Sequence, residues 1–130
     1  MRGRSYTLDD INRIVRGQYR HAWYPKRNAG DDDLLLNPKT GPSWYRGYFK
    51  DDLAQAQVEQ ALAKFDATAV VVGHTLNSRV KAMFDDKVYA IDVRHPKDYL
   101  TSFPLRGSEG LMVKDGKYFR LLEGGRIKAL

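Results

Sequence analysis

The chain has 130 residues, 42% of them hydrophobic, so it can bury one core, and we expect a single domain over residues 1–130. Its 22 Lys and Arg against 16 Asp and Glu give a formal net charge of +6, and the lack of cysteine excludes disulfides and cysteine-based metal sites. No apolar run approaches the roughly 20 residues of a membrane span, and the first residues lack the apolar core of a signal peptide. We therefore expect no membrane contact and, as written, a cytoplasmic chain; a signal lost upstream would allow a periplasmic one.

A first amphipathic helix is predicted near the N-terminus. Thr7 is typical of an N-cap, Asp9 and Asp10 follow in the first turn, and apolar residues recur at helical spacing to about Ala22. The segment 23–41, rich in Pro, Gly and Asp, is predicted to be a loop, and its three consecutive aspartates are interpreted as a solvated turn and not as a metal site.

A second helix and a buried strand follow. The helix is expected to begin at Asp52, paired with Gln55 in a variant of the capping box, and to carry an apolar stripe that ends at Phe65. Residues 69–72 form an apolar, β-branched run that predicts a fully buried parallel strand. Open α/β sheets place their chemistry just beyond the carboxyl ends of such strands, which makes His74 a candidate ligand or catalytic residue.

The remainder predicts short strands. Residues 80–84 and 88–93 are two of them, and Asp92 is expected to cap the turn after the second. Residues 110–113 and 117–122 flank Asp-Gly, which is a strong hairpin signal. The order of helix, helix, buried strand and antiparallel meander predicts an α/β (α+β) fold.

Two segments resemble a known family. The Gly73-His74-Thr75 turn, followed by strands that end in Ile91-Asp92, resembles the last conserved block of the calcineurin-like metallophosphoesterases. The segment 41–47, Gly-Pro-Ser-Trp-Tyr-Arg-Gly, is similar to the Trp-x-Arg segment of bacterial serine/threonine protein phosphatases. The resemblance implies the C-terminal half of a metallophosphoesterase β-sandwich flanked by helices, with Arg46 contacting the substrate phosphate and His74 binding a metal.

The other motifs of that family are missing from this chain. Asp-x-His, Gly-Asp-x-x-Asp and Gly-Asn-His-Glu do not occur, and one His cannot build a two-metal site. The resemblance therefore implies a piece of a metal-dependent phosphatase that is inactive alone and binds no metal tightly. The complete enzyme would use a divalent metal pair (Mn, Fe or Zn) to hydrolyse phosphomonoesters on a protein or a small molecule.

Other functions stay open. The net positive charge favours phosphate groups, including those of nucleic acid, and the N-terminal region combines basic and aromatic residues. These residues are Arg13, Arg16, Tyr19, Arg20, Trp23, Tyr24, Lys26 and Arg27. No nucleic-acid-binding motif is present, so this alternative is the less favoured one. A non-catalytic oligomeric remnant is another, since we expect an exposed sheet edge to make the chain a homo-oligomer.

Overall fold

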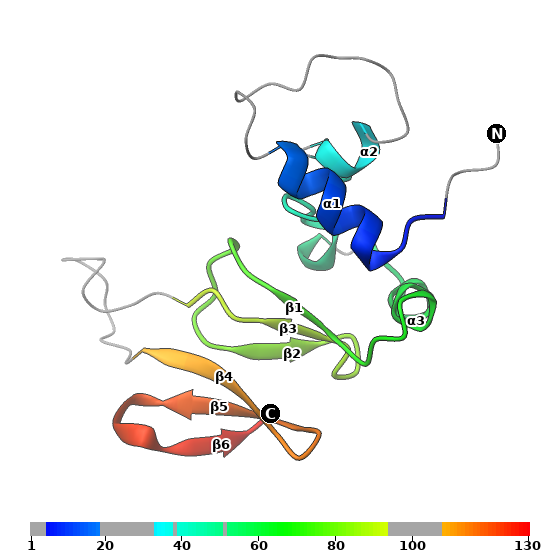
Figure 1. The fold of residues 1–130 in the computed structure, drawn as a ribbon. Coiled ribbons are helices and arrows are strands. Elements are labelled where there is room, and N and C mark those ends of the chain that lie inside the picture. Colours follow the sequence, from blue (N-terminus) through cyan, green and yellow to red (C-terminus); the bar gives the residue numbers. More distant parts are fainter. Residues whose placement is uncertain (1–4, 19–32, 38, 51, 94–107) are drawn as a thin grey trace. The chain divides into compact units, whose positions relative to one another are not determined.

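A computed structural model describes residues 5–18, 33–37, 39–50, 52–93 and 108–130 (Figure 1). The chain divides into two compact units, Met1–Leu53 and Ala54–Leu130, and each is described by itself. The expectation of a single domain stays a prediction. Within the described ranges, no helix is both long and apolar enough to cross a membrane.

The described residues of the first unit form two α-helices and a short 3-10 helix. Helix α1 spans Leu8–Gln18, and Thr7 caps it as predicted, since its Oγ1 accepts the Asp10 N–H at 3.1 Å. Residues beyond 18 in the predicted helix lie outside the described part. Helix α2, Asp33–Leu36, contacts α1, and η1 spans Gly47–Phe49.

Helix α2 corrects the prediction of a continuous loop over residues 23–41. Its sequence is Asp-Leu-Leu-Leu, and Leu35 and Leu36 are half-buried. Apolar residues can bury their side chains when the backbone forms one helical turn that packs on a neighbouring helix. The expected solvated turn of Asp31 and Asp32 lies outside the described residues.

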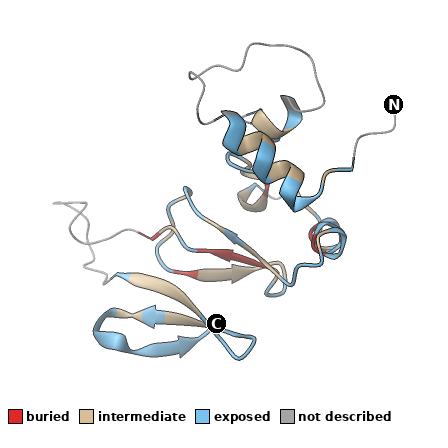
Figure 2. Ribbon diagram, in the orientation of Figure 1, coloured by how far each residue is buried: buried red, intermediate tan, exposed pale blue. Residues whose placement is uncertain are grey.

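Helix α3 opens the second unit and spans Gln55–Lys64. Its N-cap is Ala54, whose backbone N–H donates to the Gln57 side chain at 2.8 Å. The predictions that the helix begins at Asp52 and that Asp52 pairs with Gln55 are therefore wrong. Gln57 pairs with Ala54 instead, two residues after Asp52. Val58 and Leu62 are the buried residues of this helix (Figure 2).

The first sheet has the order β1-β3-β2. Strand β1 is Val70–Val72, β2 is Lys81–Met83 and β3 is Val88–Ala90. Strand β1 runs parallel to β3, as predicted, and β2 runs antiparallel to it. The prediction that the first of these strands is fully buried is wrong: Val71 is 50% exposed, whereas all three residues of β3 are buried. Among the described strands, β1 lies at the edge of this sheet and β3 has a neighbour on each side.

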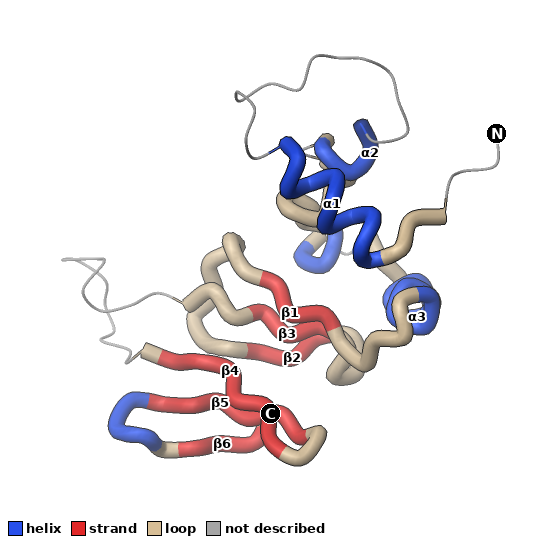
Figure 3. The backbone as a smooth tube through the Cα atoms, viewed as in Figure 1, coloured by secondary structure: helices blue, strands red, loops and turns tan. Residues whose placement is uncertain are grey.

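The second sheet is the expected antiparallel meander, in the order β4-β5-β6 (Figure 3). Strand β4 spans Glu109–Lys114, β5 spans Lys117–Leu122 and β6 spans Ile127–Ala129, with η3, Glu123–Gly125, before β6. Asp115 and Gly116 turn the hairpin with φ of 51° and 70°, the left-handed pair of a type I′ turn.

The two sheets of the second unit contact each other through side chains. The rings of Tyr89 and Tyr118 stack with centroids 4.1 Å apart. The Glu109 carboxylate accepts the Val80 N–H at 3.0 Å and is paired with Arg120. Helices and two small sheets together confirm a mixed α/β fold.

Candidate functional site

His74 lies directly beyond the carboxyl end of β1, where the sequence placed it. The Ile91 N–H donates to the Val72 carbonyl at 2.9 Å and so holds the end of β1 beside the chain that leaves β3. His74 then adopts a φ of 60° and is exposed. Left-handed backbone is unfavourable for a residue with a Cβ atom, so the surrounding contacts must hold this turn.

Those contacts come from Asn77, which sequence reasoning did not single out. Its side-chain amide donates to the Thr75 carbonyl at 2.6 Å, and its backbone N–H donates to the Asp92 carbonyl at 2.8 Å. Asn77 also forms a parallel bridge with Val93. The turn after β1 is therefore tied to the segment after β3, at the edge where both parallel strands end.

Thr75 is the last residue of the Gly73-His74-Thr75 turn, and sequence reasoning assigned it no role of its own. Its hydroxyl oxygen is buried and has no hydrogen-bond partner among the described groups. A buried polar group without a partner costs free energy, and few are found in native proteins. No local pattern in the sequence could reveal it, because the burial depends on the packing of the turn.

Arg46 lies in the first unit, in the turn that leads into η1. Its side chain donates from Nη1 to the Trp44 carbonyl at 3.1 Å, and its Cζ lies 5.9 Å from the centroid of the Trp44 ring. Arg46 is half-buried, and no carboxylate pairs with it in the described part of the chain. A guanidinium in this state offers several N–H donors to an anion.

Two buried glycines shape the turn that carries Arg46. A Cβ atom on Gly41 would collide with the backbone carbonyl of Leu35, and one on Gly47 would collide with the Tyr45 ring. The Gly41 N–H donates to the Asn37 carbonyl at 2.7 Å. The backbone at Gly41 and the Tyr45 side chain at Gly47 therefore leave no room for a Cβ atom at either position.

Two aromatic residues in and next to this turn pack on each other. Tyr45 and Tyr48 meet edge to face with centroids 5.3 Å apart. Burial, and to a smaller extent the neighbouring Tyr45, raises the pKa of Tyr48 above its ordinary value. Both rings are half-buried, whereas Trp44 is 49% exposed.

Arg46 and His74 belong to different units, so their meeting in one site stays a prediction. Among the residues that the structure describes, no group of three or more His, Cys, Asp and Glu could hold a metal ion. The basic, aromatic region proposed for nucleic acid lies largely in residues 19–32, outside the described part, and that alternative is untested. Arg13, which belongs to it, is paired with Asp10 at 3.1 Å.

Comparison with known proteins gives a match only among solved structures. No protein-family model matches the chain, and no curated protein matches it. A cold-active protein-tyrosine phosphatase of a psychrophilic Shewanella species is similar to it, with 30% identity over 96% of the chain and a TM-score of 0.76. A second structure of a cold-active protein tyrosine phosphatase and one of a point mutant each give 30% identity over 96% of the chain and a TM-score of 0.75. The chain spans 35% of each of these proteins.

These similarities correct the family expectation. The solved structures that resemble the chain are protein-tyrosine phosphatases, so its identification as a calcineurin-like metallophosphoesterase is wrong, and half of a metallophosphoesterase β-sandwich is not supported as its fold. The expected piece of a metal-dependent serine/threonine phosphatase is wrong for the same reason. The divalent metal pair (Mn, Fe or Zn) is withdrawn with it, since the described residues offer no cluster of metal ligands.

The role expected for His74 as a metal ligand depended on that pair and is not carried further. The role of Arg46 toward phosphate does not depend on a metal, and it stays a prediction. The comparison itself shows that this chain, over nearly all of its length, is similar to about a third of a protein-tyrosine phosphatase.

Proposed function

We propose that this chain is part of a protein phosphatase that hydrolyses phosphotyrosine in proteins. The observation that carries the proposal is the similarity to the Shewanella protein-tyrosine phosphatase, at 30% identity over 96% of this chain. The structural similarity supports the same relationship as the sequence identity, since the TM-score is 0.76. The chain covers 35% of that protein, so we assign to it individual residues and not the complete catalytic machinery.

In this proposal Arg46 binds the phosphoryl group. One of its N–H donors is used by the Trp44 carbonyl, and the others have no carboxylate partner in the described part of the chain. A planar guanidinium can form two parallel hydrogen bonds to phosphate oxygens, and such charge-assisted bonds are the stronger kind. The Trp44 N–H donates to the Gly41 carbonyl at 3.1 Å and the Phe49 N–H to the Arg46 carbonyl at 3.0 Å, and a turn ordered by such bonds loses less entropy on binding.

His74 belongs to the second unit and is a separate candidate for contact with phosphate. It lies at the carboxyl end of a parallel strand, is exposed, and is held in a left-handed turn by the contacts of Asn77. An imidazole there can donate a hydrogen bond to a phosphoryl oxygen or transfer a proton to the leaving phenolate. The chain contains no cysteine, so it supplies no thiolate nucleophile.

The test is binding of O-phospho-L-tyrosine to the full chain, measured by calorimetry. We expect Arg46→Gln to weaken binding at least about tenfold, because a hydrogen bond to a charged group contributes roughly 1.5–3 kcal/mol. Lys50→Gln is the matched control: Lys50 is exposed, lies four positions along the chain and loses the same charge. Equal effects of the two variants, or no binding by the unaltered chain, would contradict the role of Arg46.

A further inference from the structure

Strand β6 lies at an edge of the second sheet (Figure 1). Among the described strands it pairs only with β5, and all three of its residues, Ile127, Lys128 and Ala129, are exposed. An edge strand has a row of backbone N–H and C=O groups without a neighbouring strand, and such a row can pair with a segment of another polypeptide.

Two hydrogen bonds show which backbone groups of β6 face this open edge. The Leu122 N–H donates to the Arg126 carbonyl at 2.7 Å, and the Leu130 N–H donates to the Tyr118 carbonyl at 3.2 Å. In an antiparallel pair, bonded positions of this kind alternate with positions whose N–H and C=O groups point away from the neighbouring strand. The bonded positions of β6 are therefore the even-numbered ones, and the backbone groups of residues 127 and 129 point outward.

The register with β5 divides the side chains of β6 between the two faces of the sheet. Ile127, which is 56% exposed, lies opposite Leu121, which is 41% exposed, so two apolar side chains share one solvated face. Lys128 lies on the other face, opposite Arg120. The Arg120 guanidinium is paired with Glu109, whereas no carboxylate pairs with Lys128 among the described residues.

We propose that the β6 edge binds an extended peptide segment of another protein in which apolar residues flank an acidic residue. An added antiparallel strand bonds to the backbone of residues 127 and 129, and its side chains alternate between the same two faces. Its apolar side chains extend the row of Leu121 and Ile127, and its carboxylate lies beside Lys128. The inference is independent of the phosphate binding proposed for Arg46.

Charge favours such a peptide over a second copy of this chain. Two β6 strands paired about a two-fold axis at Lys128 would place the two lysines opposite each other. A two-fold axis at Ile127 would place Lys128 opposite Arg126, which is also an exposed cation. Like charges at opposite positions destabilise a pair of strands, whereas a carboxylate opposite Lys128 is attracted to it.

The experiment titrates peptides into the full, isotope-labelled chain and follows its backbone amide signals by NMR. The probe is acetyl-Ser-Thr-Val-Glu-Val-Thr-Ser-amide, and the matched peptide has Lys in place of Glu. We expect the amide signals of Ile127 and Ala129 to move most, because their N–H groups form new hydrogen bonds. The Glu peptide should bind about fivefold more tightly than the Lys peptide, on the scale of a cross-strand charge pair.

Three variants of the chain test the residues of the edge. Lys128→Glu should reverse the preference, so that the Lys peptide binds more tightly. Lys114→Glu is the matched control, since Lys114 is an exposed lysine of β4 in the same sheet, and it should leave the preference unchanged. Ile127→Pro removes an outward N–H that does not bond to β5, and it should weaken both peptides about fivefold. The φ of −69° and ψ of 141° at Arg126 suit a residue before proline.

Two N-methylated forms of the Glu peptide test the backbone bonds without any change to the chain. Methylation of both valines blocks the N–H groups that face β6 and should weaken binding at least about tenfold. Methylation of the glutamate, whose N–H points away from β6, is the matched control and should weaken it less.

Several results would overturn the proposal. Without a shift by any peptide at millimolar concentration, Lys128 only protects the edge from pairing. Equal binding of the Glu and Lys peptides, or a preference that Lys114→Glu reverses as well, would show that Lys128 does not select the ligand. Shifts at residues 127 and 129 that grow with the concentration of the chain alone would assign the edge to a second copy.

Discussion

Glu109 is a carboxylate held between the two sheets of the second unit. Its Oε2 accepts from the Val80 N–H at 3.0 Å and from the Arg120 Nε at 2.9 Å, and its Oε1 is paired with the other end of the guanidinium. The side chains of Glu109 and Arg120 are only 10% and 14% exposed. The pair therefore lies largely out of water, where the loss of one partner leaves the other charge unsatisfied.

The stability of the second unit should depend on pH through this carboxylate. Burial alone would raise the pKa of Glu109, but the hydrogen bonds from Arg120 and Val80, together with the positive charges of Arg120 and Arg79, outweigh burial and hold it below its ordinary value of 4.5. A carboxyl whose pKa is lowered by folding stabilises the folded state above its unfolded pKa and loses that contribution as the pH falls through its folded pKa. We expect the free energy of unfolding to fall below about pH 4.5.

Glu109→Gln checks this expectation by urea unfolding followed at several pH values. At pH 7 the variant should be less stable by about 3 kcal/mol, the order of magnitude for breaking a buried pair. Its stability should fall less steeply than that of the unaltered chain between pH 5 and pH 3, since the titrating group is gone. Parallel curves for the two proteins would show that other carboxyls cause the acid sensitivity.

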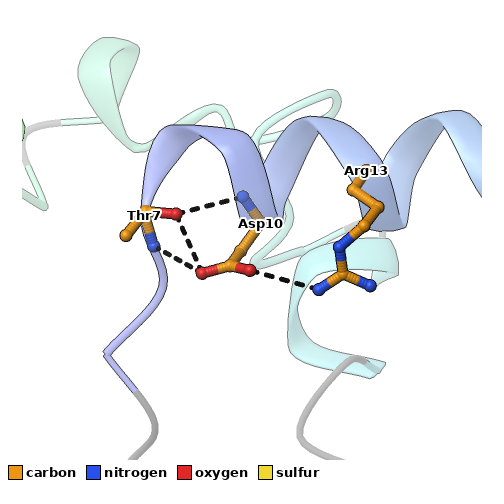
Figure 4. A network of polar contacts seen from close by, with 3 residues as sticks. All are labelled: Thr7, Asp10 and Arg13. Atoms are coloured by element: carbon orange, nitrogen blue, oxygen red, sulfur yellow. Dashed lines mark hydrogen bonds and ion pairs between the residues drawn. The ribbon is translucent and has the colours of Figure 1, made fainter.

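Helix α1 begins with a compact network of side chains (Figure 4). The Thr7 hydroxyl accepts the Asp10 N–H at 3.1 Å and donates to the Asp10 carboxylate at 2.8 Å, and that carboxylate also accepts the Thr7 N–H at 3.2 Å. Arg13 pairs with Asp10 from the next turn. Two backbone N–H groups that the helix leaves without a partner are satisfied in this way.

Thr7→Ala should lower the free energy of unfolding by about 1 kcal/mol, because alanine cannot accept the Asp10 N–H. Thr7→Ser keeps the hydroxyl and should stay within a few tenths of a kcal/mol of the unaltered chain. Thermal unfolding followed by circular dichroism at 222 nm measures both variants. If serine and alanine destabilise the helix equally, the cap does not stabilise it.

Local signals predicted these elements well, and long-range packing explains what they missed. Asp115-Gly116 specified its hairpin because the turn needs only two residues with positive φ. The prediction that β1 is fully buried was wrong. Its sequence, Val-Val-Val, is apolar, but burial depends on neighbouring elements that the sequence of the strand itself does not identify. Strand β3, with the less regular sequence Val-Tyr-Ala, is the buried one, since it lies between β1 and β2.

The same division applies to the candidate site. The position of His74 followed from the end of a β-branched run, which is a local signal. The anchoring of its turn did not, because Asn77 contacts Asp92 and Val93, which are distant along the sequence. The chemistry assigned to His74 depended on a family resemblance that the solved structures overturned.

At the level of the assembled protein, β1 offers an edge for association. Among the described strands it pairs only with β3, and its central residue, Val71, is 50% exposed. An edge strand with exposed apolar side chains can pair with another chain, and natural proteins often place lysine there to prevent it. The homo-oligomer expected from the sequence has not been tested, and this edge is where we expect it to form.

Sedimentation velocity over a range of concentrations tests this prediction. The unaltered chain should form larger species as its concentration rises, and more readily at high salt, because salt screens the repulsion of a net charge of +6. Val71→Lys should shift the equilibrium toward the monomer, since a lysine on the edge opposes strand pairing. Leu8→Lys is the matched control, since Leu8 is an apolar residue of helix α1 and is itself 52% exposed. If both variants reduce association equally, added charge alone accounts for the effect, and a chain that stays monomeric at every concentration has no such interface.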